Sequence, residues 1–112
     1  MKPRRGEVWL VDSGEPMGRE AGWQRPAVVV SSDYLNEGPS GIVIVVPCTT
    51  RNRGLRTHVE LDRAGSGLDE LSYARCEDMK SVSERRLASR LGQAGPEAMQ
   101  AISRILEFLL DL

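Results

Sequence analysis

The chain has 112 residues, with 15 Lys and Arg against 16 Asp and Glu, and a formal net charge of −1. This length fits one domain over 1–112, and the 40% hydrophobic content is that of a globular protein rather than a disordered one. The charge balance excludes a protein that is basic overall, such as a histone, but not a local basic patch.

Three further features exclude other classes. Cys48 and Cys76 are too few for a disulfide framework and predict free thiols in a reducing compartment. With a single histidine they do not form a zinc site. The longest apolar run, 42–46, is far shorter than the ~20 residues of a membrane span, and no signal peptide is visible. We therefore expect a cytoplasmic protein with no membrane contact, metal or cofactor.

The first part of the chain predicts β-strands. Residues 7–12 are rich in β-branched and aromatic side chains and stand between turn residues. A polar loop over 17–24 follows. Residues 26–31 are apolar on both faces, which predicts a central strand with Pro26 at its first position, where proline is tolerated.

The middle of the chain combines a short helical turn, a strand and a loop. Ser32 and Asp33 are predicted to cap a turn that ends at Gly38. A buried strand over 41–47 then leads into a loop over 51–56, which contains three arginines. This is the most basic stretch of the chain's centre.

The last part contains three further strands and a helix. The strands are predicted over 57–61, over 72–82 with a bend, and over 87–91. Pro96 starts a helix whose apolar residues recur every three or four positions. These residues are Ala98, Met99, Ile102, Ile105, Leu106 and Leu109. The fold class is therefore mainly β with α: a small, mostly antiparallel barrel with a C-terminal helix packed on it.

Two segments, 20–26 and 47–53, are not explained by folding alone. Both lie at the ends of apolar strands, where loops on a rigid scaffold carry function. Arg25 directly precedes the predicted central strand, and a buried charge there costs several kcal/mol unless it meets an anion. Its expected partner is either Glu20 or a ligand phosphate.

Four segments resemble the MazF/PemK family of endoribonuclease toxins, in that family's order and spacing. They are 5–12 (RGEVWLVD), 20–31 (EAGWQRPAVVVS), 45–50 (VVPCTT) and 76–82 (CEDMKSV). The similarity extends from about Arg5 to Leu110. It implies the CcdB/MazF/PemK-like toxin fold, which is an SH3-like barrel with a C-terminal helix.

The resemblance also implies an activity. Such proteins are mRNA interferases of type II toxin–antitoxin pairs, which cut single-stranded RNA at specific sequences without metal and so arrest translation and growth. The RNA 2′-hydroxyl attacks the adjacent phosphorus and leaves 2′,3′-cyclic phosphate and 5′-hydroxyl ends. The resemblance implies a homodimer and a MazE-like antitoxin with a flexible acidic tail as the inhibitory partner.

Two alternatives remain open. The first is a toxin of the related CcdB type, which binds DNA gyrase and has no nuclease activity. Such toxins act through a helix end that bears a tryptophan, whereas this chain ends in Phe108–Leu112 without one. The second is a catalytically inactive regulatory protein, in which Arg25 or Thr49 is occupied structurally.

By position in the motifs, the family's catalytic arginine and threonine correspond to Arg25 and Thr49. A guanidinium offers five donors in a planar fork suited to phosphate, and a hydroxyl can donate to the same group. Because a guanidinium keeps its proton far above neutral pH, we assign Arg25 to charge stabilisation. The general base is left open between Glu20 and His58.

Further residues are expected to bind the RNA: Trp23, Gln24, Thr50, Arg51, Arg53, His58 and Asp78. Trp23 either stacks on an unpaired base or packs as a lid over the barrel. Arg51 and Arg53 form either an RNA patch or a solvated loop. Asp78 stands where the family usually has glutamine, and its carboxylate would favour an exposed amino group such as that of cytosine.

Overall fold

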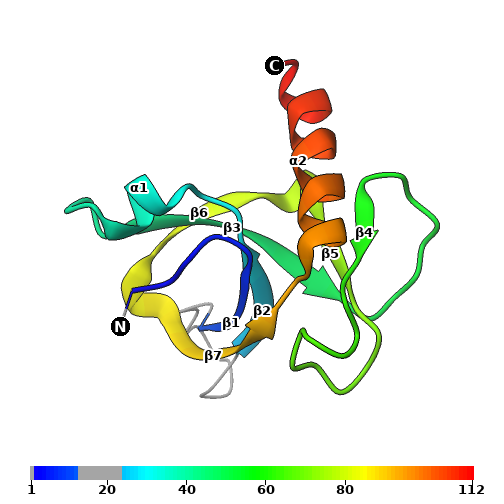
Figure 1. Cartoon of the computed structure of the whole chain (residues 1–112), viewed down its shortest axis with the longest axis horizontal. Coiled ribbons are helices and arrows are strands. Elements are labelled where there is room, and N and C mark those ends of the chain that lie inside the picture. Colours follow the sequence, from blue (N-terminus) through cyan, green and yellow to red (C-terminus); the bar gives the residue numbers. More distant parts are fainter. Residues whose placement is uncertain (1, 13–23) are drawn as a thin grey trace, which may run out of the picture.

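The computed structural model describes residues 2–12 and 24–112 (Figure 1). Its strands are β1 (Glu7–Asp12), β2 (Gln24–Val29), β3 (Ile42–Thr49), β4 (His58–Glu60), β5 (Tyr73–Arg75), β6 (Lys80–Ser83) and β7 (Leu87–Gln93). The helices are α1 (Asp33–Glu37) and α2 (Pro96–Leu110), and two 3₁₀ turns are η1 (Cys76–Asp78) and η2 (Glu84–Arg86). No helix in these ranges is long and apolar enough to cross a membrane.

All strand pairs are antiparallel and follow the order β4-β5-β3-β2-β1-β7, with β6 also paired to β3. Since β6 pairs with β3 and β7 pairs with β1, the η2 turn between them closes the strands into a small barrel. Figure 1 shows α2 rising from one side of this barrel, with its C-terminal end pointing away from it. The predicted fold class is confirmed.

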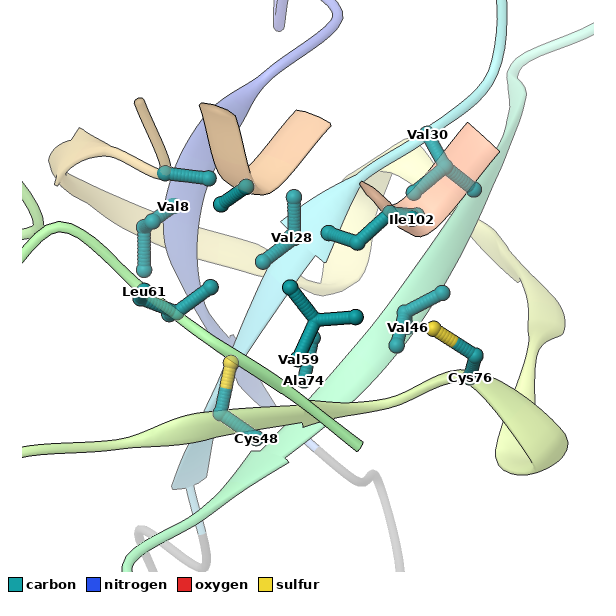
Figure 2. Packing of buried hydrophobic residues seen from close by; sticks show 12 residues of the cluster. Val8, Val28, Val30, Val46, Cys48, Val59, Leu61, Ala74, Cys76 and Ile102 are labelled. Atoms are coloured by element: carbon teal, nitrogen blue, oxygen red, sulfur yellow. The ribbon is translucent and has the colours of Figure 1, made fainter. Parts of the chain in front are cut away.

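Two apolar clusters occupy the two faces of the central strands. Alternation along each strand sends Val8, Val28 and Val46 to the cluster beneath α2, where Ile102 is completely buried (Figure 2). The neighbouring residues on the same strands form the second cluster. Its members are Trp9, Val11, Ala27, Val29, Val43 and Val45. Burial on both faces confirms that β2 is a central strand.

Several predicted elements agree closely with the structure. β1 covers the predicted residues, and α2 begins at Pro96 as expected. The short helix α1 begins after Ser32, whose hydroxyl oxygen accepts a hydrogen bond from the Leu35 amide at 3.3 Å. Gly38 then ends α1. These elements depend on local capping and turn chemistry, which is legible in the sequence.

The start of β2 differs from the prediction. The strand begins at Gln24, so Pro26 is its third residue rather than its first. Pairing with β3 begins only at Ala27, which lies opposite Pro47. That side of β2 is therefore still an edge at Pro26, where a residue without an amide hydrogen is tolerated.

The segment 72–82, predicted as one bent strand, forms two strands separated by η1. Cys48 on β3 lies opposite Ala74, whereas Val45 lies opposite Lys80. The segment therefore advances six residues, from Ala74 to Lys80, while β3 advances three, from Cys48 to Val45. The turn absorbs the excess, and this allows β5 and β6 to pair with the same edge of β3.

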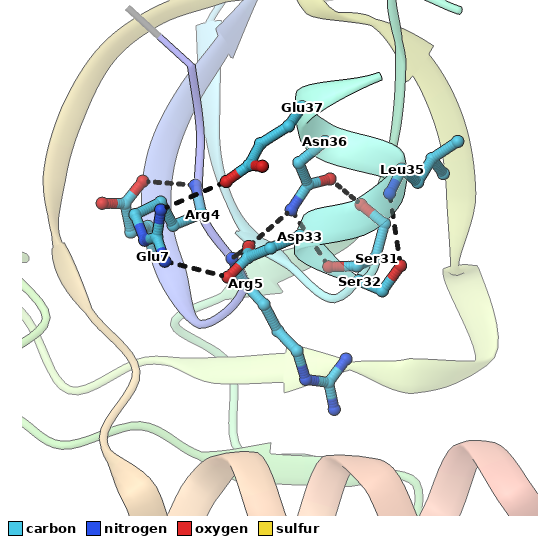
Figure 3. A network of polar contacts seen from close by, with 9 residues as sticks. All are labelled: Arg4, Arg5, Glu7, Ser31, Ser32, Asp33, Leu35, Asn36 and Glu37. Atoms are coloured by element: carbon cyan, nitrogen blue, oxygen red, sulfur yellow. Dashed lines mark hydrogen bonds and ion pairs between the residues drawn. The ribbon is translucent and has the colours of Figure 1, made fainter.

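A polar network fixes the N-terminal segment to both helices (Figure 3). Asp33 accepts a hydrogen bond from the Arg5 amide at 2.8 Å, which lowers the pKa of this carboxyl, and forms an ion pair with Arg4 at 3.3 Å. Arg4 also contacts Glu37 at 3.5 Å. The Arg5 guanidinium donates to Ser103 on α2 at 2.7 Å. Asp33 and Glu37 thus compensate the charge of Arg4, whereas the Arg5 guanidinium is bound by a hydroxyl on α2.

Glu7 belongs to the same network but is buried, with 8% of its surface exposed. Its carboxylate accepts hydrogen bonds from the Arg4 amide at 2.8 Å and from Trp9 Nε1 at 2.9 Å. Arg90 on β7 contacts its second oxygen at 3.3 Å. A buried carboxylate is stable here because each oxygen meets a donor.

Candidate active site

A pocket of about 570 Å³ lies at the ends of β2, β3 and β5 and continues over the loop that follows β3. It is lined by Arg25, Pro26, Pro47, Cys48, Thr49, Thr50, Arg51, Arg53, Ser72 and Arg75. The size suits a nucleotide rather than an ion. Five of the residues predicted for catalysis or RNA binding lie in this lining.

The strand register brings Arg25 and Thr49 together. Ala27 on β2 lies opposite Pro47 on β3, and in an antiparallel pair the next residues on this face are Arg25 and Thr49. Both line the pocket. The two side chains predicted to act on one phosphate therefore occupy neighbouring strands on one face, although they are far apart in the sequence.

The hydroxyl of Thr49 has a defined orientation. Its oxygen accepts a hydrogen bond from the Arg51 amide at 3.1 Å. Since a hydroxyl combines one donor with two acceptor lone pairs, this bond leaves its hydrogen available to a ligand oxygen. The local turn after β3 thus prepares Thr49 to donate.

The loop after β3 adds positive charge. Thr50, Arg51 and Arg53 are exposed and line the pocket. The turn is completed by Asn52, whose side-chain oxygen accepts from the Gly54 amide at 3.0 Å. Of the described residues that line the pocket, four are arginines and none is acidic. A chain with a net charge of −1 therefore presents a locally positive pocket.

Sequence reasoning missed Ser72 and Arg75. Tyr73 lies opposite Thr49, so Arg75, two residues further along β5, shares the face of Thr49. The only sequence signal is this two-residue spacing from Tyr73 to Arg75. It becomes informative once β5 is known to pair with the end of β3.

Asp78 is engaged with Arg75. Its carboxylate lies 2.5 Å from a terminal nitrogen of the Arg75 guanidinium, and both side chains are 41% exposed. The contact spans η1, because a 3₁₀ turn places residues i and i+3 above one another. Asp78 therefore holds an arginine of the pocket and is not itself part of the lining. Its role at a base edge stays a prediction.

His58 does not line the pocket. It sits on β4 opposite Arg75, its side chain is only 4% exposed, and its Nε2 lies 2.9 Å from Glu77. Partial burial raises the pKa of Glu77, but hydrogen bonds from Thr57 and His58 outweigh it and lower the pKa to about 2. His58 is thus held by a firmly ionised carboxylate, whereas Arg75 separates it from the pocket along the sheet.

The cysteines are buried, as predicted. Burial, with the neighbouring Cys76 as a smaller cause, raises the pKa of Cys48 to about 12. Burial raises the pKa of Cys76 to about 11. A thiol with such a pKa stays protonated at neutral pH, so Cys48 is a poor nucleophile although it lies beside the pocket.

Three further predicted residues are either outside the pocket lining or outside the described residues. Gln24 opens β2 opposite Asp12 and is exposed, directly before Arg25. Glu20 and Trp23 lie outside the described residues. Their predicted roles, as a partner of Arg25 and as a stacking platform, stay predictions.

Comparison with known proteins extends over nearly the whole chain. A family model described as PemK-like, MazF-like toxin of type II toxin-antitoxin system matches residues 4–110. The chain is 34% identical over 114 residues to Endoribonuclease MazF9 of Mycobacterium tuberculosis, covering 97% of each. It is 28% identical over 110 residues to Endoribonuclease EndoA of Bacillus subtilis, covering 97% of this chain and 95% of the relative.

Solved structures give the same result. A crystal structure of MazF from Deinococcus radiodurans superposes with a TM-score of 0.81 at 25% identity, over 100% of this chain and 99% of that one. An endoribonuclease in complex with its cognate antitoxin, from a mycobacterial species, also gives a TM-score of 0.81 at 25% identity. That match covers 98% of this chain and 96% of the other.

Proposed function

The chain belongs to the family of PemK-like, MazF-like toxins of type II toxin–antitoxin systems, and from this membership we propose that it is a sequence-specific endoribonuclease that cuts single-stranded RNA. Two relatives named above are endoribonucleases, and the similarity to each of them covers almost the full length of both chains. The observation that carries the proposal is the convergence of Arg25 and Thr49 on one face of the pocket.

The proposed reaction breaks the RNA with its own hydroxyl. The 2′-oxygen loses its proton and bonds to the adjacent phosphorus, the bond to the 5′-oxygen breaks, and that oxygen takes up a proton. Negative charge grows on the non-bridging phosphoryl oxygens, which the donors of Arg25 and Thr49 stabilise. The products are a 2′,3′-cyclic phosphate and a 5′-hydroxyl. Glu20 stays a predicted acceptor of the first proton, whereas His58 lies outside the pocket lining with its Nε2 bound to Glu77 and is not placed to accept it.

The proposed reaction uses no metal. Among residues 2–12 and 24–112, no group of three His, Cys, Asp or Glu side chains is placed to hold a metal ion. The charge that a metal would supply is available from the arginines of the pocket. Activity in EDTA tests this part of the proposal directly.

Substrate and partner follow from the charge of the pocket. Thr50, Arg51 and Arg53 are proposed to hold phosphates on either side of the cut. A cognate antitoxin with an acidic tail is proposed to occupy the same positive surface, in keeping with the mycobacterial endoribonuclease that was solved in complex with its cognate antitoxin. An enzyme that meets cellular RNA and keeps two unpaired thiols is proposed to act in the cytoplasm.

We also propose a homodimer. Phe108 and Leu110 at the C-terminal end of α2, and Leu112 just after it, are exposed, with Phe108 81% exposed. An apolar end of this kind is stabilised when a second copy covers it. The gyrase-binding alternative is not favoured, because the relatives are named as endoribonucleases.

Incubation of the purified protein with a long RNA in EDTA tests the proposal. We expect cuts at discrete sequences, with cyclic-phosphate and 5′-hydroxyl ends identified by end-specific labelling. Absence of cutting, together with inhibition of gyrase supercoiling by the same preparation, would replace the nuclease with the gyrase-binding alternative.

A further inference from the structure

Arg75 is a pocket residue to which the reaction described above gives no role. It reaches the pocket from β5, on the face that also carries Thr49, and lies opposite His58 of β4. The preceding residue, Ala74, points to the opposite face and packs in the core cluster. The alternation of β5 therefore directs Arg75 toward the substrate side of the sheet.

Two residues of η1 contact the strands β5 and β4 beside the pocket. Asp78 binds the Arg75 guanidinium at 2.5 Å, and Glu77 binds His58, the residue opposite Arg75, at 2.9 Å. A guanidinium oriented by a carboxylate loses little conformational freedom when it binds a ligand. Arg75 is thus presented in a fixed direction, with donors beyond those that face Asp78.

The paired carboxylate also changes what Arg75 can bind. Arg51 and Arg53 lie on an exposed loop and suit phosphates through their net charge. Asp78 compensates part of the charge of Arg75 and so reduces its attraction to a phosphate, while the remaining N–H groups of Arg75 stay directed donors. Such a pair is better suited to neutral acceptors, which in RNA are found on the base edges.

We propose that Arg75, positioned by Asp78, is a specificity-determining residue that reads a guanine base next to the cleaved phosphate. Guanine presents N7 and O6 side by side as acceptors, which match the fork of an arginine. Bases of single-stranded RNA expose these edges because they are not paired. The inference rests on the proposed ribonuclease function and adds the base that is selected.

Sequencing of the cut ends from a random RNA pool tests the inference with wild-type protein, Arg75→Ala, Arg75→Lys and Asp78→Asn. Wild type is expected to select guanine at one position beside the cut. Arg75→Ala is expected to reduce that selection at least about tenfold, the scale of one bidentate base contact. Arg75→Lys keeps the charge but not the fork, so it is expected to lose the selection as well.

The Asp78→Asn variant tests whether Asp78 positions the Arg75 guanidinium or only supports the fold. Without the compensating carboxylate, Arg75 gains net charge toward phosphates, so RNA binding is expected to tighten and to depend more steeply on salt. The guanine selection is expected to weaken at the same time. Arg104→Ala, an exposed arginine on α2, is the matched control and is expected to keep the wild-type profile. Thermal unfolding confirms that each variant is folded.

The outcomes distinguish the two proposals. If wild-type protein cuts RNA and Arg75→Ala keeps the same sequence profile, the inference is wrong and the nuclease stands. A uniform loss of cutting at all sequences, with a shallower salt dependence, would make Arg75 a phosphate contact and also overturn the inference. Altered selection at a base other than guanine overturns the base assignment. If wild-type protein cuts no RNA, the proposed function itself fails.

Discussion

Two groups of arginines in this small barrel differ in what surrounds them. At the N-terminal network, Arg4 pairs with Asp33, the Arg5 guanidinium donates to Ser103, and a buried carboxylate, Glu7, receives Arg90. At the pocket, the described part of the lining contains four arginines and no acidic residue. The same residue type holds elements of the fold together at one place and gathers around a candidate ligand site at the other.

The difference shows that net charge is a poor guide to function in a chain of this size. Carboxylates pair with the arginines that hold elements together, whereas the described residues of the pocket lining include none. Asp78 is the intermediate case, since it contacts a pocket arginine from outside the lining. We therefore expect substitutions at the two places to change different measurements.

Removing the pocket donors should give the largest effect. Arg25→Ala and Thr49→Ala are each expected to lower the cleavage rate at least ~100-fold, about 2.7 kcal/mol, the scale of one lost transition-state donor. Single-turnover cleavage of a mapped RNA site measures the change, and urea unfolding should show little loss of stability. A near-normal rate in either folded variant would remove that residue from the proposed mechanism.

Removing a carboxylate from the N-terminal network should lower the stability of the fold and leave the cleavage rate unchanged. Glu7→Ala leaves the Trp9 indole N–H and the Arg4 amide without their acceptor, and should lower the free energy of unfolding by about 2 kcal/mol. Urea titration measures this loss. Glu37→Ala, which breaks only an exposed ion pair with Arg4, is the control and should cost less than about 1 kcal/mol.

Cleavage at saturating RNA should be unchanged in the folded fraction of both carboxylate variants. A loss of cleavage that exceeds the loss of folded protein would show that this network also serves the pocket.

Removing a loop arginine should have a smaller effect, on RNA binding rather than on the cleavage rate. Arg51→Ala and Arg53→Ala should each weaken RNA binding a few-fold and reduce its salt dependence by about 0.7 in the log–log slope, the value for one phosphate of a single strand. Fluorescence anisotropy of a labelled RNA in the Arg25→Ala background measures both. An unchanged slope would assign these arginines to a solvated loop.

The smallest effect concerns acid stability. The pKa of Glu77 is about 2 in the folded chain, below its ordinary value of 4.5. A lowered pKa stabilises the fold above pH 4.5, and this contribution is lost as pH falls toward 2. Glu77→Gln should therefore be less stable than wild type near neutral pH, and the urea midpoints should converge on acidification. Parallel curves at every pH would contradict the assignment.

Local sequence signals predicted much of the fold. Ser32, Gly38 and Pro96 mark helix ends through capping and turn chemistry that acts within a few residues. The division of 72–82 could not be read in this way, since it results from pairing with β3, a long-range contact. Pro26 was misplaced for the same reason, because its tolerance depends on where a neighbouring strand begins.

The candidate site shows the same limit. Arg25 and Thr49 were found through motifs at strand ends, and Arg51 and Arg53 through the basic loop that follows a strand. The structure brings all four to one pocket. Arg75 was not found, because its position beside Thr49 depends on the pairing of β5 with β3. A prediction that includes strand register would have been needed to identify it.

The three residues of η1 also constrain how this segment can change in length. Ala74 shares the face of Cys48, whereas Val82 shares the face of Val43, so even-numbered positions change sides of the sheet across the turn. An insertion or deletion of one residue in η1 that shifted β6 by one residue against β3 would move Val82 out of its apolar cluster. We therefore expect a change in the length of η1 to be tolerated only where the turn itself absorbs it and β6 keeps its register.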